Sequence, residues 1–324
     1  MAERIYPFAV ARTRVLETRL LSRQQLTQMA EAKNAEEAMR ALKEAGYDTE
    51  LAETVHDYEK VLAREQEKTY ALMKELVPEE KFMELFLYKN DYHNAKVLIK
   101  SQITGANSAA YLVNGGAIPL ERLKKALDDH NYNSLPTILG KAVQEAFDAY
   151  ASLQDGQVID LILDKACFAA MKQTAAESKL PFVVDYVARL CDITNLKTFY
   201  RLKKMKKPVD ALKEAYVEGG GLALSTLVAA FGLEQYANAF RGTPYSALCE
   251  EGMQKGFTEF ERLCDDFMME SVKSAKFVAL TVEPLVAYQY ARESEIKTVR
   301  IIMTGKLNQI APDTIKERLR DAYV

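Results

Sequence analysis

The sequence predicts an all-α protein, and three observations support this fold class. Only 14 Gly and 9 Pro interrupt 324 residues, whereas residues that favour helices, such as Ala, Leu, Glu and Lys, are abundant. Apolar residues recur at the spacing of one helical face, as at Ala35, Ala38, Met39 and Leu42. Alternating runs of Val, Ile and Thr between turn residues are almost absent, so no sheet is expected.

Composition and charge narrow the functional classes. Hydrophobic residues make up 48% and charged residues 27% of the chain, which is typical of a globular protein. A formal net charge of -3 argues against a general nucleic-acid binder. The start, MAERIYPFAVARTRVLE, lacks the apolar core of a secretory signal, and the longest apolar stretch, at 221–233, is too short to span a bilayer. The 4 Cys are widely spaced, which predicts buried free thiols in a reducing compartment.

Helix starts and stops can be placed along the chain. Ser22 followed by Gln25 predicts a capping box at a helix start. Asn34 opens the segment AEEAMRALKEAG, which should end at Gly46. The PEE run at 78–80 restarts a helix, because acids suit the positive end of the helix dipole. Later breaks are expected at residues 115–116, 136, 156, 181, 208, 219–221, 242–244, 284 and 312.

A short helical element recurs at intervals of about 100 residues. The segments DYHNAKVLIK and DITNLKTFYRLKK, which begin at Asp91 and Asp192, share Asp, Asn and Lys at the same relative positions. A segment near the C-terminus, ESEIKTVRIIM, matches them more loosely. We interpret Asp91 and Asp192 as helix N-caps, with the Asn three residues later in the first turn. The third copy has Arg292 and Glu295 in these places, so it cannot cap in the same way.

A second element links the two ends of the chain. Residues 26–47 align with residues 224–245 without a gap, and the loosest candidate in the middle is 121–139. The separation is close to twice the interval of the first element. We therefore predict three similar helical domains around a pseudo-threefold axis, each burying apolar surface partly against the next. Their expected boundaries give domains 1–108, 109–212 and 213–324.

No catalytic or metal-binding pattern stands out in the sequence. The 3 His, at 56, 93 and 130, are isolated, with no His or Cys at ligand spacing. TGK at 304–306 lacks the preceding glycine and the following Ser or Thr of a phosphate-binding loop. GGG at 219–221 is interpreted as a flexible hinge between helical units. We therefore expect neither a catalytic residue nor a cofactor or metal site.

The densest run of positive charge lies in YRLKKMKKP at 200–208. It contains Lys203, Lys204, Lys206 and Lys207. Two interpretations are open. The run is either a docking patch for an acidic protein, a nucleic acid or anionic lipid headgroups, or a solvated helix end whose cations complement the helix dipole before Pro208.

The chain as a whole resembles a known family. The opening YPFAVARTRVLETRLLS at 6–22, the Asp-x-x-Asn-x-Lys elements and the ending ARESEIKTVRIIMTGKLNQIAPDTIKERLRDAY at 291–323 follow the order and spacing of the C subunit of V/A-type rotary ATPases. The eukaryotic member of that family is the d subunit of V-type ATPases. The most specific part is E-x-E-I-K-x-x-R-I-I, and the resemblance covers essentially the whole length.

This resemblance implies a specific role. Three similar helical domains would form a funnel, with one end on the cytoplasmic loops of the membrane rotor ring and its mouth around the central-stalk subunits. The protein would be a non-catalytic socket that transmits torque during ATP-coupled proton or sodium transport. The resemblance implies a peripheral position on the cytoplasmic face of the membrane and one copy per complex. It also implies a monomer when isolated, without a nucleic-acid partner or a small-molecule substrate.

Under this resemblance, the basic run and the glycine run are expected at the partner interface. The interface would include Lys203, Lys204, Lys206, Lys207, Gly219, Gly220 and Gly221. The alternative function is a helical-repeat scaffold that binds an unrelated protein partner on a concave surface.

Overall fold

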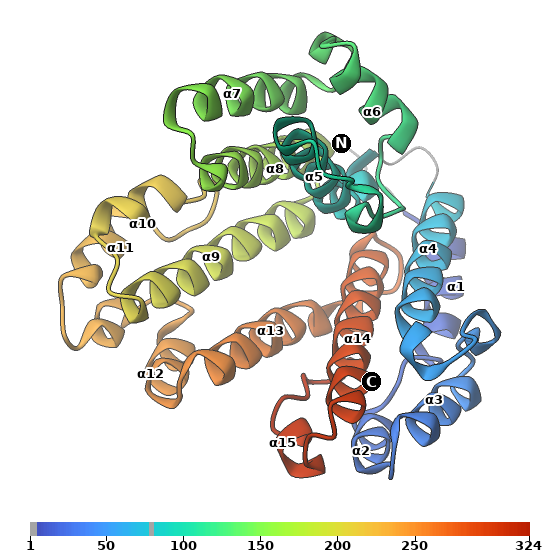
Figure 1. The fold of residues 1–324 in the computed structure, drawn as a ribbon. Helices are drawn as coiled ribbons and strands as arrows, with labels where there is room; N and C mark the ends of the chain where they lie inside the picture. The colour runs from blue at the N-terminus through green and yellow to red at the C-terminus, as the bar shows by residue number, and fades with distance from the viewer. Residues whose placement is uncertain (1–4, 78–80) are drawn as a thin grey trace. The chain divides into compact units, whose positions relative to one another are not determined.

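The computed structural model of the chain describes residues 5–77 and 81–324. In these ranges the chain forms α-helices joined by loops and short 3₁₀ helices, and no strand is present (Figure 1). The predicted all-α class is therefore confirmed. The helix start predicted at 78–80 lies outside the described residues.

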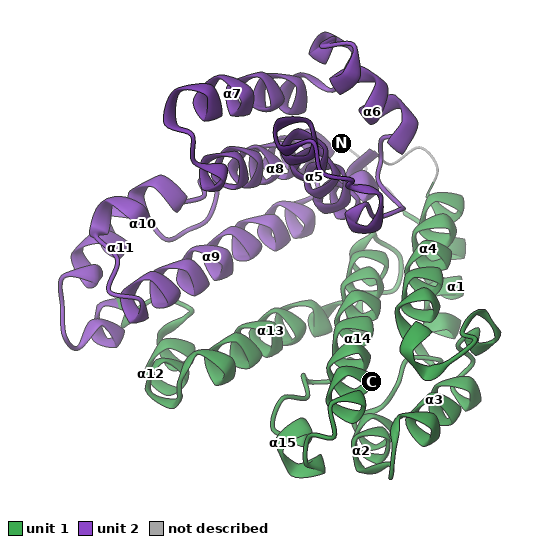
Figure 2. Cartoon of the chain, viewed as in Figure 1, with its two compact units in different colours: residues 1–78, 240–324 green, residues 79–239 purple. Residues whose placement is uncertain are grey.

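The chain divides into two compact units (Figure 2). Unit 1 combines the N-terminal part, up to residue 78, with the C-terminal part from residue 240. Its helices are α1 Pro7–Glu17, α2 Arg23–Glu31, α3 Ala35–Glu44, α4 Tyr58–Leu76, α12 Ser246–Lys255, α13 Phe257–Lys273, α14 Glu283–Leu307 and α15 Pro312–Lys316.

Unit 2 is the continuous middle part of the chain, residues 79–239. Its helices are α5 Tyr88–Thr104, α6 Leu120–Asp128, α7 Thr137–Leu153, α8 Gly156–Ser178, α9 Pro181–Lys204, α10 Val209–Ala215 and α11 Leu224–Phe231. The three predicted domains, 1–108, 109–212 and 213–324, concern internal repeats and stay a prediction.

Several helix ends follow from the local sequence. The side chain of Ser22 accepts a hydrogen bond from the backbone N–H of Gln25, and the Gln25 side chain accepts one from the backbone N–H of Ser22. The predicted capping box is therefore confirmed. Asn34 caps α3 by accepting the N–H of Glu37. Proline begins α9 and α15, where its missing N–H would have no partner within the helix.

The core of unit 1 joins the two ends of the chain. α14 lies among α1, α2, α3, α4 and α13 (Figure 1). Its buried residues lie on all of its sides. Val299, Ile302 and Met303 of α14 belong to the same apolar cluster as Leu26 of α2 and Leu62 of α4. Full burial of one such side chain contributes about 1.5–3 kcal/mol to folding. Neither end of the chain is therefore expected to fold without the other.

In unit 2, α8 is the central helix, and it packs against α5, α7 and α9. The long helix α9 is anchored by aromatic side chains towards both of its ends. Near its start, the Tyr186 ring lies 5.5 Å from that of Phe86. Near its end, the Phe199 ring meets Phe231 and Tyr236 at centroid distances of 5.5 and 5.7 Å. These contacts hold α9 in place where it carries the second copy of the recurring element.

Candidate functional site

The first Asp-x-x-Asn element binds a loop that follows its helix. On α5, the Asp91 carboxylate accepts the backbone N–H groups of Ala117 and Ile118, both at 3.1 Å. One turn further along, the Asn94 amide donates to the carbonyl of Val113 at 2.8 Å and accepts its N–H at 2.9 Å. Both side chains are buried. We call this pair the α5 clamp, because it satisfies backbone polar groups of the loop and holds it against the helix.

The second copy makes the same contacts on α9. The Asp192 carboxylate accepts the N–H groups of Gly221 at 2.8 Å and Leu222 at 2.9 Å. The Asn195 amide donates to the carbonyl of Val217 at 2.7 Å and accepts its N–H at 2.8 Å. We call this pair the α9 clamp. The sequence repeat thus corresponds to a repeated contact between a long helix and a loop that lies 19 to 30 residues further along the chain.

These contacts overturn the interpretation of Asp91 and Asp192 as helix N-caps. Asp91 lies inside α5, which begins at Tyr88, and Asp192 lies well inside α9, which begins at Pro181. Each carboxylate accepts N–H groups from a distant loop and not from the first turn of its own helix. The interpretation was wrong because a carboxylate binds free backbone N–H groups in either setting, and the residue spacing does not distinguish the two.

Glycine allows each loop to approach its clamp closely. A Cβ atom on Gly116 would lie 2.1 Å from a carboxylate oxygen of the α5 clamp, and one on Gly220 would lie 1.9 Å from Asp192 Oδ1. Gly219 has a φ of +121°, a backbone conformation that other residues rarely adopt. The glycine run interpreted from the sequence as a hinge is therefore packed against α9.

On α14 the corresponding pair is Arg292 and Glu295, which binds the N-terminal part of the chain. Glu295 accepts the backbone N–H of Leu21 and the hydroxyl of Tyr47, each at 2.5 Å. Arg292 forms a salt bridge with Glu295 at 2.5 Å and lies 3.6 Å from Glu65. Burial raises the pKa of Glu295, whereas the charge of Arg292 and the hydrogen bonds from Tyr47 and Leu21 act to lower it. We call this group the α14 clamp.

The three clamps share one contact. The side chain at the second position, Asn94, Asn195 or Glu295, accepts the backbone N–H of Val113, Val217 or Leu21, respectively. Each of these loops leads into a short helix, which is α6, α11 or α2. In unit 2 the loop follows the long helix along the chain, whereas the α14 clamp takes its loop from the opposite end. The three repeat domains and their pseudo-threefold arrangement stay a prediction.

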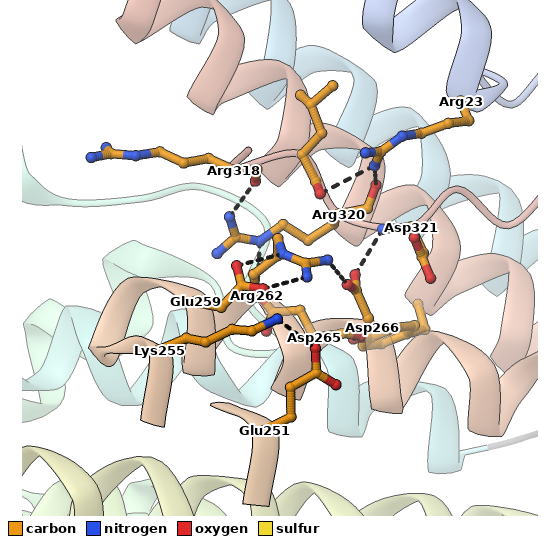
Figure 3. A network of polar contacts seen from close by, with 12 residues as sticks. Arg23, Glu251, Lys255, Glu259, Arg262, Asp265, Asp266, Arg318, Arg320 and Asp321 are labelled. Atoms are coloured by element: carbon orange, nitrogen blue, oxygen red, sulfur yellow. Dashed lines mark hydrogen bonds and ion pairs between the residues drawn. The ribbon is translucent and has the colours of Figure 1, made fainter. Parts of the chain in front are cut away.

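A polar network fastens the C-terminal residues of unit 1 to α13 (Figure 3). Asp265 accepts a hydrogen bond from Arg320 at 3.0 Å. Asp266 accepts the backbone N–H of Asp321 at 2.7 Å and pairs with Arg262 at 2.5 Å. Burial raises the pKa of Asp266 to about 6, although the N–H of Asp321 acts to lower it. The network holds the chain end through its backbone as well as its side chains.

Two further contacts join the two ends of the chain within unit 1. Arg23, at the start of α2, donates to the carbonyls of Leu319 at 3.1 Å and Arg320 at 2.9 Å. The hydroxyl of Tyr323 donates to Glu17 of α1 at 3.1 Å. The N-terminal and C-terminal segments are therefore fixed to each other as well as to α14.

The structure separates the predicted basic run into two parts. Lys203 is half-buried, and its ammonium donates to two carbonyl groups at and just beyond the C-terminal end of α11. The positive charge of Lys203 therefore lies at the negative end of the α11 dipole, which is favourable. Lys204, Lys206 and Lys207 are exposed, and the Lys204 ammonium lies 5.5 Å from the ring centre of Tyr200. Lys203 thus stabilises unit 2, and the other three lysines face solvent.

Within residues 5–77 and 81–324, no three His, Cys, Asp or Glu side chains are grouped closely enough to hold a metal ion. All four Cys are free and buried, as predicted. A cavity of about 440 Å³ in unit 2 is lined in part by Asp91, both of whose oxygens already accept N–H groups in the α5 clamp. No described helix combines the length and the apolar composition needed to cross a bilayer.

Comparison with known proteins shows relatives along almost the whole chain. Residues 9–318 match the family described as ATP synthase (C/AC39) subunit. The chain is 26% identical over 272 residues to the C subunit of the V-type sodium ATPase of Enterococcus hirae, which covers 82% of this chain and 83% of that protein. It is 25% identical over 342 residues to the C subunit of the A-type ATP synthase of Methanocaldococcus jannaschii, with coverages of 97% and 86%. For the C subunit of the A-type ATP synthase of Thermococcus onnurineus, the identity is 24% over 334 residues, with coverages of 98% and 90%.

Gly220→Ala is expected to lower the free energy of unfolding by about 1–3 kcal/mol, because the added methyl group overlaps the buried Asp192 carboxylate. Circular dichroism during chemical unfolding measures this change in a chain that lacks Trp. Gly156→Ala is the matched control, since a Cβ there meets nothing within 4 Å, and its effect should stay within about 1 kcal/mol. If Gly220 packs closely against Asp192, the loss of unfolding free energy caused by Gly220→Ala should be smaller when Asp192→Ala is also present. If Gly220 serves only as a flexible hinge, the loss should be the same in both backgrounds.

Glu295→Gln is expected to lower the free energy of unfolding by about 3–5 kcal/mol, because it leaves the charge of Arg292 buried without its nearest partner. The matched control is Glu59→Gln, which breaks an exposed salt bridge of α14, between Glu59 and Arg300, and should cost less than about 1 kcal/mol. Chemical unfolding of the two variants gives the comparison. Equal losses would contradict the importance assigned to the α14 clamp.

The stability of unit 2 is expected to depend on the ionisation of Asp91. Burial raises the pKa of Asp91 from 3.8 to about 6, although the N–H groups of Ile118 and Ala117 lower it. The folded chain therefore holds this proton more tightly than the unfolded chain, and ionisation weakens folding. The contribution of Asp91 is fully present below pH 3.8, falls as the pH rises to about 6, and is constant above that.

Over that range the unchanged protein should lose on the order of 3 kcal/mol of unfolding free energy relative to Asp91→Asn, which cannot ionise. Chemical unfolding of both proteins between about pH 4 and pH 8 measures the difference. If the unfolding free energies of the two proteins changed with pH in parallel, the pKa of Asp91 in the folded chain would be close to its ordinary value.

Proposed function

Because the chain belongs to the ATP synthase (C/AC39) subunit family, we propose that it is the non-catalytic central-stalk connector of a V/A-type rotary ATPase. In this role it joins the central rotor shaft to the membrane rotor ring and transmits torque during ATP-coupled proton or sodium transport. The family match over residues 9–318 carries the proposal, and relatives named as C subunits of A-type and V-type enzymes support it.

The packing within each unit is consistent with a part that transmits force. Each clamp ties a long helix to a loop through at least one hydrogen bond, so the loop cannot slide along the helix without breaking that bond. In unit 1, the α14 clamp ties the N-terminal part of the chain to α14, and the network on α13 ties the C-terminal residues to α13. A connector that transmits torque needs such fastening, because loose ends would yield before the load reached the next subunit.

The exposed end of the basic run is the partner surface that we propose. Lys204, Lys206 and Lys207 lie at and just after the C-terminal end of α9 and face solvent. Opposite charges on a partner would speed encounter and fix the register of docking more than they would add affinity. Lys203 also belongs to the interface predicted from the sequence, and its internal contacts would hold the exposed lysines in position.

We propose the glycine run as a second part of the partner interface. Gly219, Gly220 and Gly221 follow α10, and the backbone at Gly221 is exposed although its N–H is bound by Asp192. A partner would meet backbone here with no side chain in between. We propose the central-stalk subunits and the cytoplasmic loops of the rotor ring as the partners of these two surfaces. One copy would act in each complex, peripheral to the membrane on its cytoplasmic face, and the isolated protein would be a monomer.

Recovery of the complex with a tagged copy of the full chain tests the proposal. The tagged protein is isolated from gently solubilised membranes, and the co-purified subunits are identified by mass spectrometry. We expect the head, stalk and ring subunits of the rotary ATPase. Simultaneous Lys204→Glu, Lys206→Glu and Lys207→Glu changes should reduce recovery of stalk or ring subunits roughly tenfold at physiological salt, because they place like charges across the interface.

The matched control reverses three other exposed lysines of unit 2, at Lys124, Lys125 and Lys141. Recovery should then equal that of the unchanged protein. If the unchanged protein recovers no ATPase subunit from a membrane that contains the complex, the connector role is wrong. If the unchanged protein recovers the complex and both sets of reversals behave alike, the role stands and the basic surface is wrong.

A further inference from the structure

A patch of large apolar side chains is exposed where the start of α1 meets the segment between α13 and α14. Phe277 is 91% exposed and Phe8 is 77% exposed, which are the highest values among the large exposed apolar side chains of the described residues. Ile5 is 60% exposed and Leu280 is 49% exposed. Single exposed apolar residues are common, whereas four from two adjoining segments indicate a surface that is covered by something.

The backbone beneath these side chains is held firmly. The N–H of Tyr6 donates to the carbonyl of Leu280 at 2.6 Å, which joins the start of α1 to the segment after α13. Arg14 donates to the carbonyls of Ala275 and Val278, both at 2.7 Å, from the other end of α1. Ala275 is itself fully buried. The apolar side chains are therefore presented by anchored backbone and are not exposed through fraying of a chain end.

The exposed charges near this patch are mainly positive, and the acid of the second segment, Glu283, is half-buried and accepts a hydrogen bond from the Thr281 hydroxyl. Arg12 lies one helical turn after Phe8 and is exposed, and Lys276 directly precedes Phe277 and is also exposed. Glu17 is the acidic residue of α1, and it is buried in a salt bridge with Arg14 at 2.8 Å. We call Ile5, Phe8, Phe277, Leu280, Arg12 and Lys276 the apolar–basic patch.

We propose that the apolar–basic patch contacts the surface of a lipid bilayer that carries anionic headgroups. Aromatic and aliphatic side chains enter the boundary between headgroups and acyl chains, while arginine and lysine bind the lipid phosphates. A protein partner with an apolar pocket would account for the phenylalanines, and the cations beside them favour a surface dense in phosphate. The inference rests on the proposed function only in that this function brings the protein to a membrane.

With four apolar side chains and two cations, the contact is reversible and weaker than a membrane-spanning anchor. Its role would be to steady unit 1 against the membrane while other subunits supply the main attachment.

Sedimentation of the purified full-length protein with lipid vesicles tests this contact. The vesicles consist of phosphatidylcholine alone or of phosphatidylcholine with added phosphatidylglycerol. The unchanged protein should sediment with the anionic vesicles and several-fold less with the neutral ones. Phe8→Ser with Phe277→Ser should reduce binding to anionic vesicles about tenfold. Arg12→Gln with Lys276→Gln should reduce it to the level of neutral vesicles.

The matched control is Leu153→Ser with Leu233→Ser, two exposed apolar residues of unit 2 that are 65% and 49% exposed. It should bind anionic vesicles as the unchanged protein does. Circular dichroism melting of each variant shows whether it has folded, and because all the altered side chains are exposed, the melting curves should coincide. The proposal is overturned if the unchanged protein does not sediment with anionic vesicles, or if the control loses as much binding as the phenylalanine variant.

Co-purification from membranes separates this inference from the proposed function. If the protein does not bind vesicles and the phenylalanine variant loses rotor-ring subunits, the patch contacts protein and the lipid proposal is wrong. If vesicle binding follows the prediction and no ATPase subunit is recovered, the lipid contact stands and the connector role is wrong.

Discussion

Arg292 and Glu295 of α14 form a salt bridge that is almost completely withdrawn from solvent, with 5% of each side chain exposed. Two charges in such a place are costly unless further polar groups bind them. Here the further partners of Glu295 come from the opposite end of the chain, as the backbone N–H of Leu21 and the hydroxyl of Tyr47. The requirement to satisfy this buried pair therefore determines where the N-terminal helices lie, and it makes unit 1 from segments that are more than 200 residues apart in sequence.

In unit 2, polar groups also have to be bound where a loop packs against a long helix. A loop that runs beside a long helix has backbone N–H and C=O groups that the helix backbone cannot bind, because its own groups are already paired. Asp and Asn one turn apart supply acceptors and a donor from the helix surface, and they do so on α5 and on α9. Close approach then requires Gly116 and Gly220, since a Cβ at either position would overlap the carboxylate. The glycine run is thus a consequence of the clamp.

These features suit a protein whose proposed task is mechanical. Catalysis would need groups left free to react, whereas the acids of the three clamps are occupied with backbone N–H groups. The other part of the proposed role, binding to neighbouring subunits and to the membrane, would depend on the exposed surface. It has lysines beyond the end of α9 and an apolar–basic patch at the start of α1, which offer different chemistry to different neighbours. Lys203 shows how one residue of a charged run can be structural while the residues that follow it face outward.

The sequence by itself determined the all-α class, the capping box at Ser22, the cap at Asn34 and the family to which the chain belongs. These follow from local signals, because helix propensity, capping and apolar spacing act within a few residues. It also indicated that the Asp91 and Asp192 elements recur, yet it could not show their role, since a cap and a loop clamp use the same carboxylate chemistry. Only the tertiary structure decided that these acids bind loops 26 to 30 residues away, that the glycines are packed and that Lys203 is bound internally. It alone revealed that the N-terminus completes the α14 clamp, because which distant backbone meets a buried side chain depends on how the whole core closes.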